Sequence, residues 1–225
     1  SIPQKNIIPL AGKPLMGWVC EAAKSSKLID EIILSSDDEQ IISAARSYKI
    51  NAPFKRPSDL AKDDSLIVNV INHALCWLRE HQGKKFDYVC LLQPTAPLVE
   101  ANDYDRVIQK AIDNDADTVI TVYPCDQQHP AIMFTLKQDG KADWFLNNSE
   151  NRMSRRQDLP PIYMRSGLAY VFKTSMILEK RALYGERLYA VEVPTERGMI
   201  DINSPLDLKL AEALMQENLK TYPVN

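Results

Sequence analysis

The stretch Tyr88-Val-Cys-Leu-Leu-Gln-Pro-Thr-Ala-Pro-Leu98 is an apolar run that ends at a glutamine and then carries two prolines within four residues. Its first five residues are typical of a buried strand. Pro94 and Pro97 fix their φ angles and lack backbone donors, so the loop that follows has few conformations. Ligands of open α/β sheets bind just beyond the carboxyl ends of strands. We therefore expect the loop to present Gln93 and Thr95 to a ligand; by spacing alone, a turn that merely ends the strand is an equal alternative.

Helices and strands alternate on both sides of this stretch. Apolar residues spaced three and four apart predict amphipathic helices, and short β-branched runs predict buried strands. The predicted helices are 14–25, 38–48, 65–80, 102–114, 174–180 and 204–219, and the predicted strands are 31–35, 88–92, 117–123, 167–172 and 188–193. This order predicts an α/β fold with a doubly wound, mainly parallel sheet and helices on both of its faces.

The alternation breaks after Pro130. The segments 133–136 and 142–145 flank Gln138-Asp-Gly-Lys141, and an Asp-Gly turn between two short runs predicts a β-hairpin. We expect one α/β domain over 1–225, with this hairpin in an inserted lobe at about 131–165. The lobe has little core of its own, yet it carries Phe134, Trp144 and Phe145. A two-fold homodimer would bury these aromatic side chains, and packing on the main sheet is the alternative.

Composition narrows the class of protein. The chain has 225 residues, of which 45% are hydrophobic and 25% charged, as in ordinary globular domains. Its formal net charge of -3 lacks the excess of positive charge that is typical of nucleic-acid-binding proteins. No apolar run approaches the ~20 residues that span a bilayer, and residues 1–10 do not resemble a signal peptide. The four cysteines form no C-x-x-C pair, which favours reduced thiols over disulfides or zinc. We expect a cytoplasmic protein without a membrane or nucleic-acid partner.

A second polar motif lies in Gly198-Met-Ile-Asp-Ile-Asn-Ser-Pro205. Asp201 and Asn203 are two residues apart at the end of an extended run, so their side chains should point the same way. Two oxygen-bearing side chains on one side suit a hard cation such as Mg²⁺. Ser204 is the predicted N-cap of the last helix, with Asp207 at the capping-box position.

Seven fragments together resemble one family, the cytidylyltransferases that activate nine-carbon 2-keto sugar acids, the CMP-sialic acid synthetases. The fragments follow the family's order over nearly the whole chain. They are Ser1-Ile-Pro-Gln-Lys-Asn6, Ser35-Ser-Asp37, Arg56-Pro-Ser-Asp-Leu-Ala-Lys-Asp63, Leu91 to Leu98, His129-Pro130, Arg165-Ser-Gly-Leu-Ala-Tyr170 and Ile200-Asp-Ile-Asn-Ser-Pro-Leu-Asp-Leu208. Single fragments of this kind recur by accident, whereas the ordered set is specific.

The resemblance implies an enzyme that transfers CMP from CTP to the anomeric hydroxyl of the sugar acid and releases pyrophosphate with the help of Mg²⁺. It implies that Lys5 and Asn6 belong to the nucleotide loop, with Lys5 in a catalytic role, and that Arg56 and Asp37 lie near the nucleotide. Asp201 matches a catalytic, metal-binding aspartate, with Asn203 as its metal partner. Without the ordered fragments, Lys5 and Arg56 would be read as solvated surface charges.

The resemblance also assigns residues to the sugar acid. Gln93 matches a sugar-contacting glutamine, with Thr95 in the same loop, and Arg156 and Arg165 align with arginines near the sugar. The forked guanidinium of arginine matches the two oxygens of a carboxylate, which the substrate carries. Family members pair through the hairpin lobe, which again predicts a homodimer.

The chain departs from the family pattern in four places. The family begins with a strand and a basic phosphate loop, and Ser1 corresponds to the last part of that loop. Asn203 stands where the family has a second aspartate, and Ile132 and Val99 replace a lysine and an arginine. These changes favour a legionaminic, pseudaminic or deaminated acid over N-acetylneuraminic acid. Two alternatives stay open: another sugar nucleotidyltransferase, such as one that uses an eight-carbon sugar acid, and a nucleotide-binding module without activity.

Overall fold

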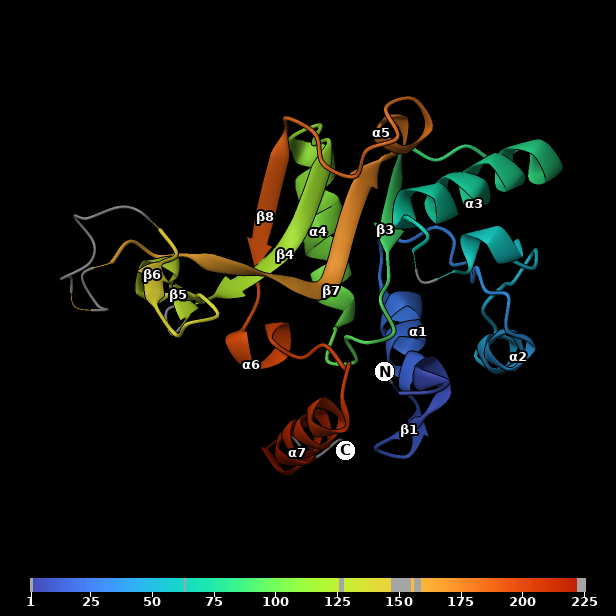
Figure 1. The fold of residues 1–225 in the computed structure, drawn as a ribbon. Helices are drawn as coiled ribbons and strands as arrows, with labels where there is room; N and C mark the ends of the chain where they lie inside the picture. The colour runs from blue at the N-terminus through green and yellow to red at the C-terminus, as the bar shows by residue number, and fades with distance from the viewer. Residues whose placement is uncertain (1, 63, 126–127, 147–154, 156–158, 222–225) are drawn as a thin grey trace.

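The computed structural model describes residues 2–62, 64–125, 128–146, 155 and 159–221. Figure 1 shows a central sheet with helices packed around it. The sheet has four strands in the spatial order β3 (Tyr88–Leu91), β7 (Tyr163–Lys173), β4 (Thr118–Pro124) and β8 (Leu188–Glu192). These strands coincide with four of the predicted strands, although β7 begins earlier than predicted.

Three strands of the sheet share one direction and β7 opposes them. β3 and β4 each pair antiparallel with β7, and β4 pairs parallel with β8. The α/β prediction is confirmed, with a sheet that is mixed rather than mainly parallel in its pairings. The physical reason lies between β4 and β7, where the described residues form a hairpin and a short 3-10 helix instead of a crossover helix. A chain that returns without a crossover forms an antiparallel neighbour.

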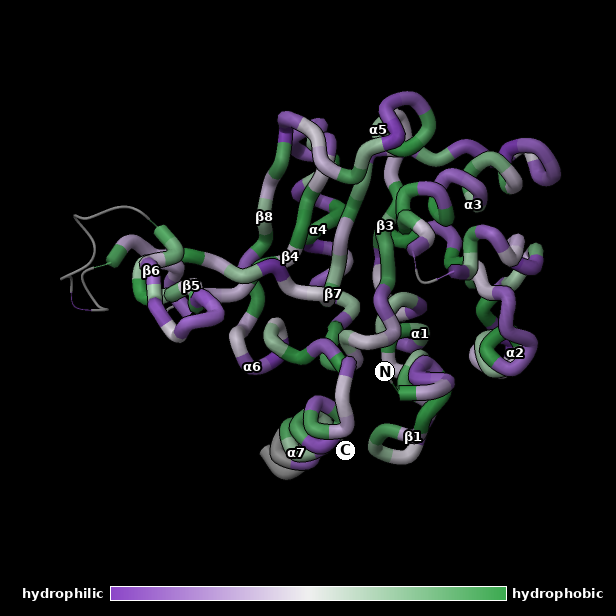
Figure 2. The backbone as a smooth tube through the Cα atoms, viewed as in Figure 1, coloured by the Kyte–Doolittle hydropathy of each residue, from purple (hydrophilic) through white to green (hydrophobic). Residues whose placement is uncertain are grey.

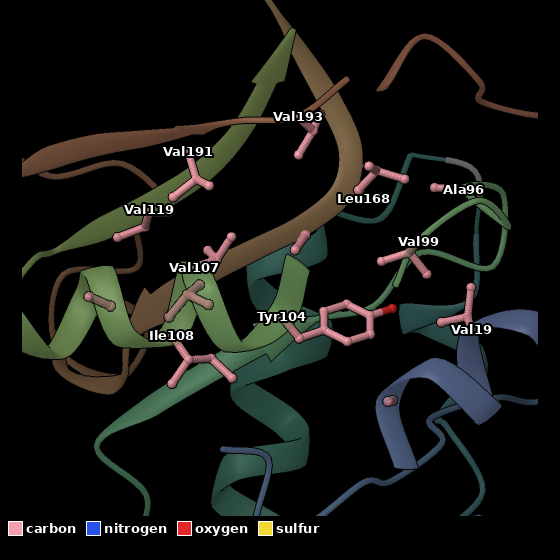
Figure 3. Packing of buried hydrophobic residues seen from close by; sticks show 14 of the residues in the cluster. Val19, Ala96, Val99, Tyr104, Val107, Ile108, Val119, Leu168, Val191 and Val193 are labelled. Carbon is pink, nitrogen blue, oxygen red and sulfur yellow. The ribbon is translucent and has the colours of Figure 1, made fainter. Parts of the chain in front are cut away.

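Helices cover both faces of the sheet, as predicted. On one face α4 (Ala101–Asp113) and α1 (Leu15–Ser25) enclose a core in which Val107 and Val119 are fully buried (Figure 3). On the other face α3 (Ile67–Gln82) and α5 (Thr174–Leu178) pack against strand residues such as Phe172. Burial of each such aliphatic side chain stabilises the folded state by roughly 1.5–3 kcal/mol relative to leaving it exposed. Hydrophobic stretches run along the strands, while the outer turns of α3 are hydrophilic (Figure 2).

The remaining elements complete the predicted order. Helix α2 covers Glu39–Ser47, and α7 covers Pro205–Thr221 as predicted from its capping sequence. Short elements are η1 (Lys5–Ile7), β1 (Pro9–Leu10), β2 (Lys13–Pro14), η2 (Ser58–Leu60), η4 (Pro130–Ile132) and α6 (Thr195–Gly198). No helix in the part of the chain that the structure describes is long and apolar enough to cross a membrane.

One predicted strand is wrong. Residues 31–35 make a single parallel bridge, from Ile33 to Asn51, and are otherwise irregular. The Leu34 amide donates to the Asn51 carbonyl over 2.7 Å. The apolar run at 31–35 is real, because Ile32 and Leu34 pack against the buried cluster formed by α1 and α2. Burial alone does not make a strand; a strand also needs a hydrogen-bonded neighbour along its length.

The predicted hairpin is present. β5 (Phe134–Leu136) pairs antiparallel with β6 (Ala142–Trp144), and the connecting turn places Gly140 at φ 84°. This left-handed value is one that glycine adopts without strain, which explains the Asp-Gly sequence. The hairpin extends away from the main sheet (Figure 1). The proposed extent of the lobe and the one-domain boundary remain predictions.

All four cysteines are free thiols. Burial raises the pKa of Cys20 to about 11 and that of Cys90 to about 12. At neutral pH these two groups are therefore uncharged and behave as small apolar side chains.

A buried ion pair connects α6 to the start of α4. Arg197 donates to both carboxylate oxygens of Asp103, over 2.6 and 3.2 Å, and to the Leu98 carbonyl over 3.2 Å. Asp103 is 1% exposed and also accepts from the Glu100 amide over 2.9 Å in a capping box. Because Leu98 ends the loop that follows β3, this pair fixes the far end of that loop.

We predict that Arg197→Met lowers the free energy of unfolding by about 3 kcal/mol, because it leaves the Asp103 carboxylate buried without its cation. Urea denaturation followed by circular dichroism measures the change. Lys55→Met is the control, since it breaks the exposed Lys55–Glu39 pair and should alter stability far less. Equal changes in the two variants would contradict the prediction.

Candidate active site

Two loops meet beyond the carboxyl end of β3. One is the predicted loop 93–98, and the other, 199–203, follows α6. The Ile202 amide donates to the Thr95 carbonyl over 2.8 Å, and Ile202 is fully buried. Water does not compete for a buried bond of this kind, so the two loops hold one relative position. Asp201 and Asn203 flank Ile202 and are exposed, so their side chains stand at the surface beside the loop.

The N-terminal turn η1 reaches the same place. Gln4 precedes η1 with φ 49°, in the left-handed region, and redirects the chain. Lys5 then donates from Nζ to Oδ1 of Asn203 over 2.8 Å, and Nδ2 of Asn203 donates to Oδ2 of Asp201 over 2.9 Å. We call this series the lysine–amide–aspartate chain. The structure thus joins three predicted site residues, one of which is almost the whole sequence away from the other two.

Asp207 fixes the backbone below this chain. Its Oδ2 accepts hydrogen bonds from the Asn203 amide over 2.9 Å, the Ser204 amide over 2.7 Å and the Ser204 hydroxyl over 2.9 Å. The bond from the Asn203 amide is the main cause that lowers the pKa of Asp207. The capping box predicted for α7 is therefore confirmed, and it also fixes the backbone of Asn203.

The donor set at this place is small. Asp201 supplies one carboxylate and Asn203 one amide oxygen, and no group of three or more His, Cys, Asp or Glu side chains able to hold a metal ion occurs among the described residues. A magnesium ion with few protein ligands keeps several waters and takes substrate phosphate oxygens, and one carboxylate suits that arrangement. Oδ1 of Asn203, however, is engaged by Lys5 and would have to leave it to reach a cation.

Arg56 and Asp37 form a second group at the start of α2. The Arg56 guanidinium donates from Nε to the Ser35 hydroxyl over 3.0 Å and also bonds the Ser35 carbonyl. Burial lowers the pKa of Arg56, and the negative charge of Asp37 partly opposes that effect. Helix α2 is connected to the residue before η1, because Nε2 of the Gln4 side chain donates to Oε1 of Gln40 over 2.9 Å. Asn6 lies in η1 beside Lys5.

Gln93 lies against β7. A methyl group built on Gly167 would come within 3.0 Å of Oε1 of Gln93, closer than is usual, so the glycine provides room for the glutamine. Tyr170 of β7 is paired with Leu91, at the end of β3. Burial is the main cause that raises the pKa of Tyr170. Because the Ile202 amide bonds the Thr95 carbonyl, the segment that carries Asp201 lies at the same end of the sheet as Gln93 and Tyr170.

Arg165 reaches the same tyrosine from the start of β7. Its guanidinium lies 5.7 Å from the centre of the Tyr170 ring and donates from Nη1 to the Tyr184 hydroxyl over 2.7 Å. Arg165 itself is exposed. Arg156, the other arginine predicted to bind the sugar acid, lies outside the described residues.

A surface hollow elsewhere does not coincide with this site. It has a volume of about 490 Å³ and lies between α4 and β8, lined by Arg106, Pro124 and the segment 192–195. None of the predicted site residues lines it. We place the site by the convergence of functional groups because a triphosphate and a sugar are recognised by charge and hydrogen bonds, which an open surface can provide.

Three supporting residues were missed as site residues: Asp207, Tyr184 and Arg197. The sequence indicated Asp207, but only as a capping residue of the last helix. Arg197 and Tyr184 belong to no quoted fragment, and their partners Asp103 and Arg165 are distant in sequence. Contacts between distant positions leave no mark on local periodicity.

Comparison with known proteins places the chain. A model of the family described as Cytidylyltransferase matches residues 1–222. The chain is 32% identical over 222 residues to a pseudaminic acid cytidylyltransferase of Campylobacter jejuni, covering 96% of this chain and 91% of that protein. It is 29% identical over 226 residues to a CMP-N,N'-diacetyllegionaminic acid synthase of Legionella pneumophila, with coverage of 96% and 91%.

Solved structures share the fold. A CMP:2-keto-3-deoxy-manno-octonic acid synthetase complexed with CTP superimposes with a TM-score of 0.71 at 15% identity, covering 97% of this chain and 94% of that chain. At this sequence identity the structural similarity shows a shared fold and nothing about function. The family model extends over nearly the whole sequence, including the two segments that form the lysine–amide–aspartate chain. The protein therefore belongs to the cytidylyltransferase family.

Proposed function

We propose that this cytidylyltransferase transfers CMP from CTP to the anomeric hydroxyl of a nine-carbon 2-keto sugar acid and releases pyrophosphate. The observation that carries the proposal is the meeting of the lysine–amide–aspartate chain with Gln93 and Arg165 at one end of the sheet. Two relatives that this chain covers over 91% of their length are named for pseudaminic and legionaminic acid, which are acids of this class.

The proposed reaction sets an electrostatic demand. The sugar oxygen forms a bond to the α-phosphorus of CTP, the bond from that phosphorus to the bridging oxygen breaks, and pyrophosphate leaves with the electron pair while the hydroxyl releases its proton. The attacking oxygen approaches a group that is already negative, so fixed positive charge must stabilise the transition state. Lys5 is the cation that the fold brings to this place, where its ammonium group bonds Asn203 in the structure.

We further propose Asp201 as the ligand of a magnesium ion, with Asn203 as a second ligand once its oxygen leaves Lys5. When bound, the ion supplies additional positive charge to the phosphate oxygens. Arg56 and Asp37 line the approach of the nucleotide, with Asn6 in the adjoining turn. We also propose a cytoplasmic location for the protein.

The sugar acid is proposed to lie over the first part of β7, near Arg165. Arg165 offers a guanidinium to the substrate carboxylate, and Gln93 offers an amide for its hydroxyl groups. Thr95 stands in the same fixed loop, and Arg156 remains a proposed second arginine. Val99 and Ile132 replace charged residues of the family pattern; Val99 is 7% exposed and packs in the core, so it does not meet the substrate directly.

A homodimer is proposed through the hairpin lobe. Leu136 is 76% exposed, Phe145 57% and Phe134 52%, an apolar concentration that a second copy would cover. The exposure of these side chains in a single chain favours the dimer over packing on the main sheet.

The substrate is tested by measuring pyrophosphate release with CTP and a panel of pseudaminic, legionaminic, N-acetylneuraminic and eight-carbon sugar acids. We expect turnover with CTP and at least one nine-carbon acid, and a kcat/KM for the eight-carbon acid at least about tenfold lower, because groups built for the longer chain stay unpaired. A preference for the eight-carbon acid would contradict the proposal and indicate an eight-carbon sugar acid cytidylyltransferase. CTP binding without turnover of any acid would indicate a nucleotide-binding module without activity.

Asp201→Ala tests the catalytic site. We predict that kcat falls at least about a hundredfold, because the variant loses the carboxylate proposed to hold the cation. Asp201 is exposed, so thermal melting should be unchanged. Glu196→Ala is the matched control, since it removes an exposed carboxylate from the neighbouring α6. Full activity of Asp201→Ala would exclude Asp201 from the reaction.

Leu136→Asp tests the dimer. By sedimentation velocity we expect a dimer for the unmodified protein and a monomer for this variant, because a charge in the interface is desolvated without a partner. Leu66→Asp changes a side chain that is 64% exposed at the start of α3, and it should remain dimeric. A monomer at every concentration of unmodified protein would rule the dimer out.

A further inference from the structure

Tyr184 lies in the loop between α5 and β8, and the fold fixes the backbone on both sides of it. Before it, the Leu183 carbonyl accepts from the Thr118 hydroxyl over 2.6 Å, and the Ala182 amide donates to the Met176 carbonyl over 3.1 Å. After it, Gly185 sits so close to Asp117 that an added methyl group would come within 2.4 Å of the Cβ of Asp117. The tyrosine therefore projects from an anchored position.

The phenol of Tyr184 is the hydrogen-bond partner of Arg165. Nη1 of Arg165 donates to the hydroxyl over 2.7 Å, and this bond is the main cause that raises the pKa of Arg165. Tyr170 lies below the guanidinium, with its ring centre 5.7 Å from the Cζ atom, and is only 7% exposed. One tyrosine thus bonds an edge of the guanidinium and the other supports its face.

The charge of Arg165 is left for a ligand. A guanidinium carries five N–H donors, and Tyr184 accepts one of them. Among the described residues no carboxylate forms an ion pair with Arg165, in contrast to Arg187 and Arg197. Both Arg165 and Tyr184, which is 44% exposed, are accessible from solvent. An oriented arginine without a counter-ion is suited to bind an anion.

We propose that Tyr184 is a positioning residue for the sugar acid. It holds Arg165 over Tyr170 by one edge, so that the remaining donors face the substrate carboxylate in a fixed fork. This inference rests on the proposed function, since it assigns Tyr184 to recognition of the same substrate. A neutral partner suits the task, because a carboxylate at position 184 would offset the charge that the substrate must meet.

The test replaces the phenol by a ring of the same size. In Tyr184→Phe we expect the KM for the acid that the panel turns over fastest to rise about five- to tenfold, which is the effect of losing one ordinary hydrogen bond. The kcat and the KM for CTP should stay within about twofold of the unmodified protein. Such a split indicates lost ground-state binding of the acid alone. Tyr189→Phe on β8 is the matched control and should change neither KM.

A second measurement tests whether the effect depends on the carboxylate of the sugar acid. The unmodified protein should prefer the acid over its methyl ester, and Tyr184→Phe should lose about the same factor of that preference as it loses in KM. Arg165→Lys should raise the KM for the acid further, and adding Tyr184→Phe to it should have little additional effect, because the two residues act as one unit.

The outcomes separate the two proposals. If the unmodified protein turns over no sugar acid, the proposed function falls, and the role of Tyr184 falls with it. If the unmodified protein is active and Tyr184→Phe leaves the KM for the acid and the preference over the ester within twofold, the role of Tyr184 alone is refuted. An equal rise in KM for CTP would likewise refute it, since a general distortion would be the cause.

Discussion

The site depends on the buried backbone hydrogen bond from Ile202 to the Thr95 carbonyl. It connects the loop that ends β3 to the segment that presents Asp201 and Asn203. Each loop is also held separately: Arg197 bonds the Leu98 carbonyl at the end of the first, and Asp207 bonds the Asn203 amide in the second. Because every one of these contacts satisfies a backbone group, the loops are fixed without using the side chains that face the ligand.

The sheet topology explains why these segments meet. β3 and β7 are antiparallel neighbours and Leu91 pairs with Tyr170, so the residues following Leu91 lie beside the part of β7 that precedes Tyr170, at Gly167. Had a crossover helix made β7 parallel to β3, its Arg-Ser-Gly segment would lie at the opposite end of the sheet, away from Gln93. The interruption of the helix and strand alternation after Pro130 is therefore a requirement of the site.

Local patterns predicted the elements, the Asp-Gly hairpin, the cap of α7 and the loop after β3, because each depends on neighbours in sequence. The strand at 31–35 was wrong because an apolar run signals burial, whereas strand pairing depends on a partner elsewhere. The direction of β7 was missed for the same reason. Family resemblance supplied Lys5, Asp201 and Arg165, but neither pattern nor resemblance indicated that Asn203 joins the first two or that Tyr184 holds the third.

The hydrogen-bond partners of the basic side chains differ between those that stabilise the fold and those proposed to bind the substrates. Arg197 and Arg187 bond carboxylates, of Asp103 and of Asp115 and Asp117, and these pairs neutralise their charge within the protein. The three proposed ligand-binding cations bond neutral acceptors instead: Lys5 an amide, Arg56 a hydroxyl and a carbonyl, and Arg165 a phenol. A neutral acceptor orients a cation without forming a direct ion pair with it, so the cation can still pair with a ligand anion.

This difference matters because both proposed substrates are anions that repel each other. Two unit charges 4 Å apart interact by about 1 kcal/mol in water and about 4 kcal/mol at the lower effective dielectric near a protein surface. A chain with a net charge of -3 adds no general attraction for either substrate. Oriented cations that form no ion pair among the described residues, Lys5 beside Asn203 and Arg165 over Tyr170, therefore provide the local field proposed to bring triphosphate and carboxylate together.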